Sequence, residues 1–140
     1  LAALRHRLER ALHDDVGVVA HDAREEHGVG RWLEVIGERT AARARYERVA
    51  HLLEEASWDA ARLARRDGDR NRARELWREL AVRGDPRAWI ELAKLHEHHD
   101  RDLAAARMAV REARACGGGS LDDLDLREQR LVRKERGEGA

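Results

Sequence analysis

The segment "ARRDGDRNRARELWREL", residues 64–80, decides the fold, because Gly68 and Asp69 interrupt a run that otherwise favours one continuous helix. Most of its other residues are Ala, Leu, Arg and Glu, which are strong helix formers. Glycine readily adopts the left-handed backbone that ends a helix, and aspartate accepts the first free amide hydrogen bonds of the next one. A single break of this kind predicts a turn, whereas a break that recurs at a fixed period predicts a repeat.

The break occurs three times along the chain at a nearly constant period. In each copy a small residue precedes the turn by about two helical turns, and an alanine and then a large apolar residue follow the turn. The small residues stand at positions 30, 61 and 93, so the intervals between copies are nearly equal (61 − 30 = 31 and 93 − 61 = 32). They are Gly30, Ala61 and Ala93; the turns are at Gly37, Gly68 and Arg101; the later pairs are Ala42 and Tyr46, Ala73 and Trp77, Ala106 and Val110. The third copy uses one additional residue and the turn His99-Asp100-Arg101-Asp102 in place of glycine.

This spacing predicts pairs of antiparallel helices, and we find no alternating strand pattern, so we expect an all-α fold. A small residue lets the two helices of a pair approach closely, and the large residue fills the space toward the next pair. We expect an α-α superhelix of about three helix hairpins with N- and C-terminal capping helices. The predicted helices are an N-terminal one with the stripe Leu1, Leu4, Leu8 and Leu12, and helices over residues 18–36, 39–54, 57–66, 69–82, 86–99, 102–115 and 120–136.

Local signals mark several of these helix starts. Ser57 and either Asp69 or Asn71 are expected N-caps, Asp85 precedes Pro86 at a first helical position, and Ser120 forms a capping box with Asp123. We expect one domain over residues 1–136, with repeats at 23–54, 55–84 and 85–116 and a C-terminal helix at 120–136. The Gly run at 117–119 is expected to be a flexible break, and residues 137–140 a frayed tail.

The order of small residue, Gly-Asp turn, alanine and aromatic resembles the tetratricopeptide repeat, whose period is about 34 residues. Trp89 with Leu92 and Ala93 is similar to the usual start of its first helix. The second and third copies match best, and the first is degenerate before Gly30. The alternative is an irregular helical bundle.

A longer resemblance covers nearly the whole chain. The stretch "RELWRELAVRGDPRAWIELAKLHEHHDRDLAAARMAVREA", residues 74–113, resembles the region after the nuclease domain of bacterial YprB-type ribonuclease H-like proteins. The segments "LAALRHRLERAL" (1–12) and "LDLREQRLVRKE" (124–135) are similar to helices on either side of that region. His96 and His99 depart from the family pattern. The resemblance implies that this chain is the C-terminal half of such a protein and that the nuclease lies on a preceding segment.

Composition limits the function classes. The chain has 140 residues with 28 positive and 28 negative side chains, so its net charge predicts no partner. Only Lys94 and Lys134 are lysines, which leaves 28 − 2 = 26 arginines and indicates a GC-rich bacterial genome. The single Cys116 excludes an internal disulfide and fits a reducing cytosol, so we expect a cytoplasmic protein. No apolar run is long enough to span a bilayer, so we expect no membrane partner.

We expect no catalytic residue and no cofactor. A two-metal exonuclease needs carboxylates from several strands, and the one acidic cluster with a neighbouring histidine near the start, residues 13–15, more simply begins a helix. The stretch "HEHHD", residues 96–100, has histidines one turn apart, as a zinc site does, but we find no third and fourth ligand at a convincing spacing. We therefore expect no metal and place His96 in the helix packing. Trp32, Trp58, Trp77 and Trp89 are expected to be packing residues, with Trp58 open to a groove.

The first helices of the three hairpins are expected to line a concave, positively charged groove. Arg62, Arg66 and Lys94 are the expected anchors for an acidic segment, with Trp58 as an apolar wall. The alternative is that these cations pair with neighbouring acids or are merely solvated. The full set of predicted groove residues is Arg31, Trp58, Arg62, Arg65, Arg66, Arg87, Lys94 and His98.

Two function classes remain. The first is a non-catalytic scaffold whose groove binds a protein or an acidic peptide. The second is a nucleic-acid-binding accessory domain that delivers substrate to a ribonuclease H-like exonuclease domain absent from this chain. The basic segment at residues 130–136 could contact phosphates in the second class, although a solvated helix end is the simpler interpretation. An enzyme acting by itself is the least favoured class.

Overall fold

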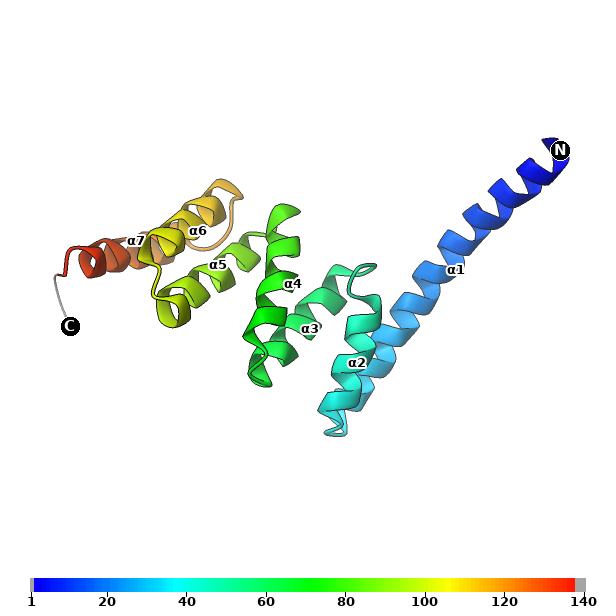
Figure 1. The fold of residues 1–140 in the computed structure, drawn as a ribbon, viewed down its shortest axis with the longest axis horizontal. Coiled ribbons are helices and arrows are strands. Elements are labelled where there is room, and N and C mark those ends of the chain that lie inside the picture. Colours follow the sequence, from blue (N-terminus) through cyan, green and yellow to red (C-terminus); the bar gives the residue numbers. More distant parts are fainter. Residues whose placement is uncertain (1, 138–140) are drawn as a thin grey trace. The chain divides into compact units, whose positions relative to one another are not determined.

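The computed structural model describes the backbone of residues 2–137 and, within them, the side chains of residues 2–3, 21–120 and 122–137. This part of the chain is all-α and contains no strand, as predicted (Figure 1). The helices are α1 (Ala2–Val35), α2 (Arg39–Val49), α3 (Glu54–Arg66), α4 (Arg70–Val82), α5 (Pro86–Leu95), the π-helical turn η1 (His96–Asp100), α6 (Leu103–Ala115) and α7 (Leu121–Glu135).

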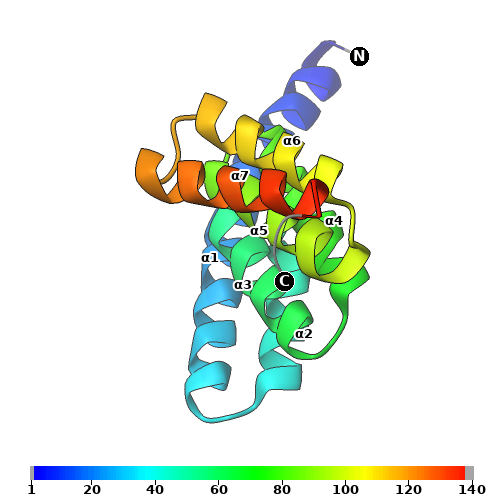
Figure 2. The same ribbon diagram turned by 90° about the vertical axis from the view of Figure 1, so that its left-hand side faces the viewer.

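The chain forms two compact units, Leu1–Ala64 and Arg65–Ala140, and the boundary falls in the last turn of α3. In the first unit α1 packs along α2, and a small apolar cluster joins Ala23, Val49 and Ala56. In the second unit α5 packs against α4 and α6, and α7 lies beside α6 (Figure 2). The single domain and the superhelical arrangement stay predictions.

The small residues of the repeat are packed as the spacing predicted. A Cβ atom on Gly30 would lie 2.6 Å from Cε1 of the Tyr46 ring, so α1 and α2 approach too closely for any larger residue. Ala61, Ala73 and Ala93 are completely buried. Trp77 is 2% exposed, which confirms its expected place in the core.

The turns also follow the repeat. Gly37 and Gly68 have φ of 88° and 82°, the left-handed backbone that glycine adopts without strain. Arg101 takes the same place in the third hairpin with φ of 57°. The additional residue is absorbed by the π-helical turn η1, where the Asp102 amide donates to the His96 carbonyl at 2.9 Å.

Two of the expected helix starts and one expected capping box differ. The helix α1 runs unbroken from Ala2, so the N-terminal capping helix is not a separate element; an internal glycine such as Gly17 costs about 1 kcal/mol, which does not end a helix. The helix α3 begins at Glu54, so Ser57 is not an N-cap; its buried hydroxyl donates to the Ala50 carbonyl at 2.5 Å. Ser120 precedes α7, but its side chain makes no cap hydrogen bond.

The other starts are confirmed. The Asp69 and Asp85 carboxylates accept the amide hydrogen bonds of Arg72 and Arg87, and Pro86 is the first residue of α5. The Gly run, expected to be a flexible break, is a packed turn. Gly118 is buried against Pro86, where a Cβ atom would lie 1.9 Å from the proline Cβ.

Candidate binding site on the C-terminal unit

The predicted groove residues are divided between the two units. Arg31, Trp58 and Arg62 belong to the first unit, and Arg65, Arg66, Arg87, Lys94 and His98 to the second. Arg31 and Arg66 are exposed, and Trp58 is half-buried. The predicted residues are therefore described separately for each unit.

The expected anchor Arg62 is committed to acids of its own unit. Its guanidinium donates to both carboxylate oxygens of Glu34, at 2.6 and 2.8 Å, and to Asp59 at 3.1 Å. The hydrogen bond to Glu34 outweighs the opposing effect of burial and raises the pKa of Arg62. Glu34 also accepts from the Tyr46 hydroxyl at 2.8 Å, so this carboxylate ties α1 to α2 and α3. Two carboxylates, Glu34 and Asp59, therefore meet the single cation of Arg62.

In the second unit, Arg65 and Lys94 share one carboxylate. Glu91 accepts from Arg65 at 3.0 Å and from Lys94 at 2.8 Å. Arg87 pairs with Asp85 at 3.0 Å and remains largely exposed. The alternative that these cations pair with neighbouring acids therefore holds for Arg62, Arg65, Arg87 and Lys94.

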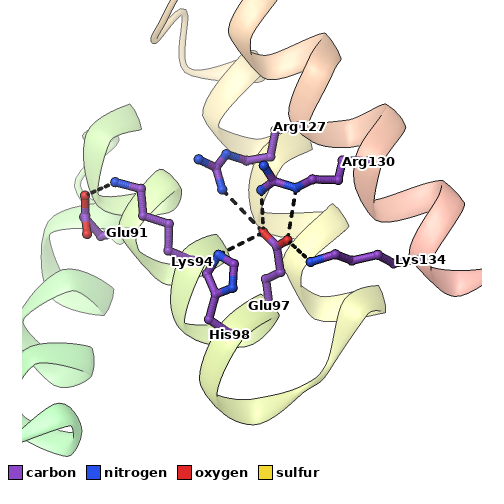
Figure 3. A network of polar contacts seen from close by, with 7 residues as sticks. All are labelled: Glu91, Lys94, Glu97, His98, Arg127, Arg130 and Lys134. Atoms are coloured by element: carbon purple, nitrogen blue, oxygen red, sulfur yellow. Dashed lines mark hydrogen bonds and ion pairs between the residues drawn. The ribbon is translucent and has the colours of Figure 1, made fainter. Parts of the chain in front are cut away.

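The centre of the unit's charge is Glu97, whose side chain is fully buried in η1 (Figure 3). Its carboxylate accepts from Arg130 at 2.8 and 3.2 Å and from Lys134 at 2.7 Å, and Arg127 lies 3.4 Å away. The ring of His98 lies 3.5 Å from the same group. Burial opposes ionisation of Glu97, but the hydrogen bonds from Lys134 and Arg130 outweigh it and hold its pKa below the ordinary value.

The helix α7 separates its charges onto two edges. One edge faces α6, where three acids meet three arginines. The other edge faces η1, where three cations meet the single Glu97. The acidic pairs are Asp125 with Arg114, Glu128 with Arg111 (3.3 Å) and Glu135 with Arg107 (2.6 Å), and the basic residues are Arg127, Arg130 and Lys134.

Positive charge is consequently in excess on the side of α7 that faces α5 and η1. Counting both clusters, five cations share two carboxylates, Glu91 and Glu97, and Asp123 adds one acid at the hollow itself. An open hollow of about 400 Å³ lies on this side. Cationic and apolar side chains line it together with the Gly-Ser turn and one acid: Ile90, Lys94, Gly119, Ser120, Asp123, Leu124, Leu126, Arg127 and Arg130.

Sequence reasoning found Lys94 but assigned no groove role to Arg127 or Arg130. The signal was present, because positions 127, 130 and 134 are spaced i, i+3, i+7 and so lie on one face of a helix. From the sequence alone, residues 130–136 are either a solvated helix end or a basic segment that contacts phosphates, and neither interpretation links them to the groove. The buried partner of these cations, Glu97, lies about 30 residues earlier in the chain, in η1. No local sequence pattern links Glu97 to α7.

The histidine stretch of η1 is engaged in ion pairs. His96 donates through Nδ1 to Asp100 at 2.9 Å, and Arg74 donates to the other oxygen of Asp100 at 2.6 Å. Among the described residues no three His, Cys, Asp or Glu side chains are grouped so as to hold a metal ion. The 13–15 cluster lies outside the described side chains.

Two of the predicted packing tryptophans have different surroundings. Trp89 is half-buried against the core of the second unit, as expected of a packing residue. Trp32 is 60% exposed, so its assignment as a packing residue was wrong; it lies near the C-terminal end of α1, on a face that the other helices of its unit leave uncovered.

Within residues 2–137, none of the helices has the length and apolar character needed to cross a membrane. Comparison with protein-family models, with curated proteins and with solved structures finds no match to this chain.

Proposed function

We propose that this chain is a non-catalytic helical-repeat module whose C-terminal unit binds an acidic segment of a partner protein. The observation that carries the proposal is the charge separation of α7. Three of its acids, Asp125, Glu128 and Glu135, pair with arginines of α6, while Arg127, Arg130 and Lys134 share Glu97 beside an open hollow. Arginine pairs readily with carboxylates in a bidentate way and is common at protein interfaces.

The proposed site differs from the groove that the sequence predicted. Arg62 is held by Glu34 and Asp59, whereas Lys94 lies in the same hollow as Arg127 and Arg130. Lys94 is therefore the one expected anchor that we retain.

The wider context of the proposal rests on the sequence resemblance. Helix hairpins at the period of this chain favour a tetratricopeptide-like module, which commonly serves as a protein-binding scaffold. The YprB-type resemblance favours the C-terminal half of a larger nuclease-like protein. The lone Cys116 favours a cytoplasmic location.

The alternative is a nucleic-acid-binding accessory. A phosphate backbone is uniformly negative, and it is best matched by a continuous basic stripe. The acidic edge of α7 and Asp123 in the hollow interrupt such a stripe, so an acidic peptide fits the described surface better.

A direct test is fluorescence anisotropy of the full chain with labelled ligands at 50 and 200 mM salt. The ligands are an acidic peptide, its Glu→Gln counterpart, single-stranded RNA and single-stranded DNA. We expect binding of the acidic peptide to exceed that of its Gln counterpart at both salt concentrations. If RNA or DNA binds more tightly than the peptide and loses about 10³-fold or more between the two salts, the accessory function replaces this one.

A further inference from the structure

The two ends of the hollow beside α7 carry opposite charges. Asp123 and Ser120 lie at the start of α7, and Arg127 and Arg130 lie one to two turns further on. At a rise of 1.5 Å per residue, Asp123 and Arg130 are separated by about 10 Å along the helix axis. A ligand that is acidic throughout would meet the Asp123 carboxylate at one end, so the site favours a ligand with its acid at the other end.

Apolar surface lies beside the cations. Leu126 is 64% exposed although it lines the hollow, and Ile90 from α5 is half-buried on the same wall. An exposed leucine next to arginines has apolar surface that a ligand side chain can cover, and each buried methylene contributes about 0.8 kcal/mol.

The arginines are held in place before any ligand arrives. Glu97 accepts from Arg130 through two nitrogens, and its side chain has no exposed surface. The guanidinium groups therefore lose less side-chain freedom on binding than free surface arginines would. Because one carboxylate cannot neutralise three cations, a second carboxylate is still attracted to Arg127 and Arg130.

We infer that the hollow takes two side chains of an acidic partner segment: a carboxylate on Arg127 and Arg130, and an adjoining branched apolar side chain on Ile90 and Leu126. This inference rests on the proposed function and names the motif that the module reads. A hollow of about 400 Å³ has room for one or two side chains, not for a folded domain. The cations favour a carboxylate and the exposed Leu126 favours an apolar side chain, so the expected occupant is a peptide that carries both.

The test uses three fluorescein-labelled peptides in a Gly-Ser background. The first contains adjacent Glu and Leu, the second has Gln in place of Glu, and the third has Ser in place of Leu. Each is titrated against the full chain and against Leu126→Ser, Arg127→Gln and Met108→Ser. Met108 is the matched control, because it is 62% exposed on α6 and lies outside the hollow.

We expect the wild-type chain to bind the Glu-Leu peptide about fivefold or more tightly than either altered peptide. Leu126→Ser should abolish the preference for Leu and keep the preference for Glu. Arg127→Gln should reduce the preference for Glu. Because Glu97 keeps Arg130 and Lys134 as partners, this variant should still fold. Thermal melting checks the folding of each variant. Met108→Ser should bind all three peptides as the wild type does.

Each contrary result has one meaning. If the wild type binds the Leu and Ser peptides equally but prefers Glu to Gln, the two-residue motif is overturned and the proposed function stands. If the wild type shows no preference for Glu, both are overturned. If Met108→Ser loses the preference for Leu as Leu126→Ser does, the motif is read elsewhere and the inference fails.

Discussion

Two glycines of α1 differ in whether the structure has room for a methyl group at their position. Gly28 has open space around it, whereas a Cβ atom on Gly30 would lie 2.6 Å from the completely buried ring of Tyr46. Both have the same cost in a helix, about 1 kcal/mol relative to alanine. The contact between α1 and α2 therefore explains Gly30, and nothing in the structure explains Gly28.

Alanine at the two positions should have opposite effects. Gly28→Ala should raise the free energy of unfolding by about 0.5–1 kcal/mol through helix propensity alone. Gly30→Ala should lower it by about 1–3 kcal/mol, because the methyl group overpacks the contact with Tyr46. Chemical denaturation monitored by circular dichroism measures both, and a gain in stability for Gly30→Ala would show that the two helices are further apart.

The residue scale is also where sequence reasoning performed best. Asp69 and Asp85 each accept the amide of a residue two or three positions later, so their capping role is written in the local sequence. Ser57 satisfies the same local pattern, yet it lies inside α3 and donates to Ala50 in the preceding turn of the chain. Tertiary packing determines the place of Ser57 inside α3, and a local capping rule contains no information on tertiary packing.

Among the elements, the turn of the third hairpin contains the one non-glycine residue with positive φ in the described chain. The backbone of Arg101 at φ of 57° is left-handed, which costs a residue other than glycine about 1–2 kcal/mol. Its counterparts Gly37 and Gly68 avoid that cost. The third repeat therefore retains the turn geometry with a less suitable residue.

Arg101→Gly should stabilise the chain by about 0.5–1 kcal/mol, because relief of strain exceeds the added freedom of the unfolded chain. The matched control is Gly68→Ala, which should destabilise by about 1 kcal/mol for the opposite reason. Thermal melting of both variants provides the comparison. A lower melting temperature for Arg101→Gly would mean that the arginine side chain contributes more than its backbone costs.

The attachment of α7 to η1 depends on the ionised form of Glu97. Hydrogen bonds to a charged group contribute about 1.5–3 kcal/mol, so Glu97→Gln should lower the free energy of unfolding by that amount at pH 7. The pKa of Glu97 is lowered in the folded chain, so its contribution is complete above the ordinary glutamate value of about 4.3 and is lost as the pH falls through the folded value.

Denaturation measured from pH 7 to pH 2 should show this loss of the Glu97 contribution at low pH. The difference between the wild type and Glu97→Gln should be constant near neutrality and should shrink below about pH 4. Glu112→Gln, which changes an exposed carboxyl on α6, serves as the control and should follow the wild type throughout. A difference that is equally large at pH 2 would mean that the ionised form of Glu97 does not hold α7.

At the scale of the whole molecule, a chain with 28 charges of each sign still has a locally positive surface. The sequence was sufficient to predict helix hairpins, because their signals are local and recur in every copy of the repeat. It was not sufficient for the candidate site, because Glu97 meets Arg130 and Lys134 on a different helix, and Glu34 meets Arg62 in the same way. Which cations keep a surplus depends on these long-range pairs.

The most direct test of the central claim is a ¹H–¹⁵N correlation spectrum of the labelled chain during titration with the Glu-Leu peptide. The proposed site predicts that the largest shifts fall on the amides of the hollow, including Ile90, Lys94, Leu126, Arg127 and Arg130, while those of α1 and α2 remain unchanged. Largest shifts on the exposed end of α1 around Trp32, or no shifts at a peptide excess, would contradict it.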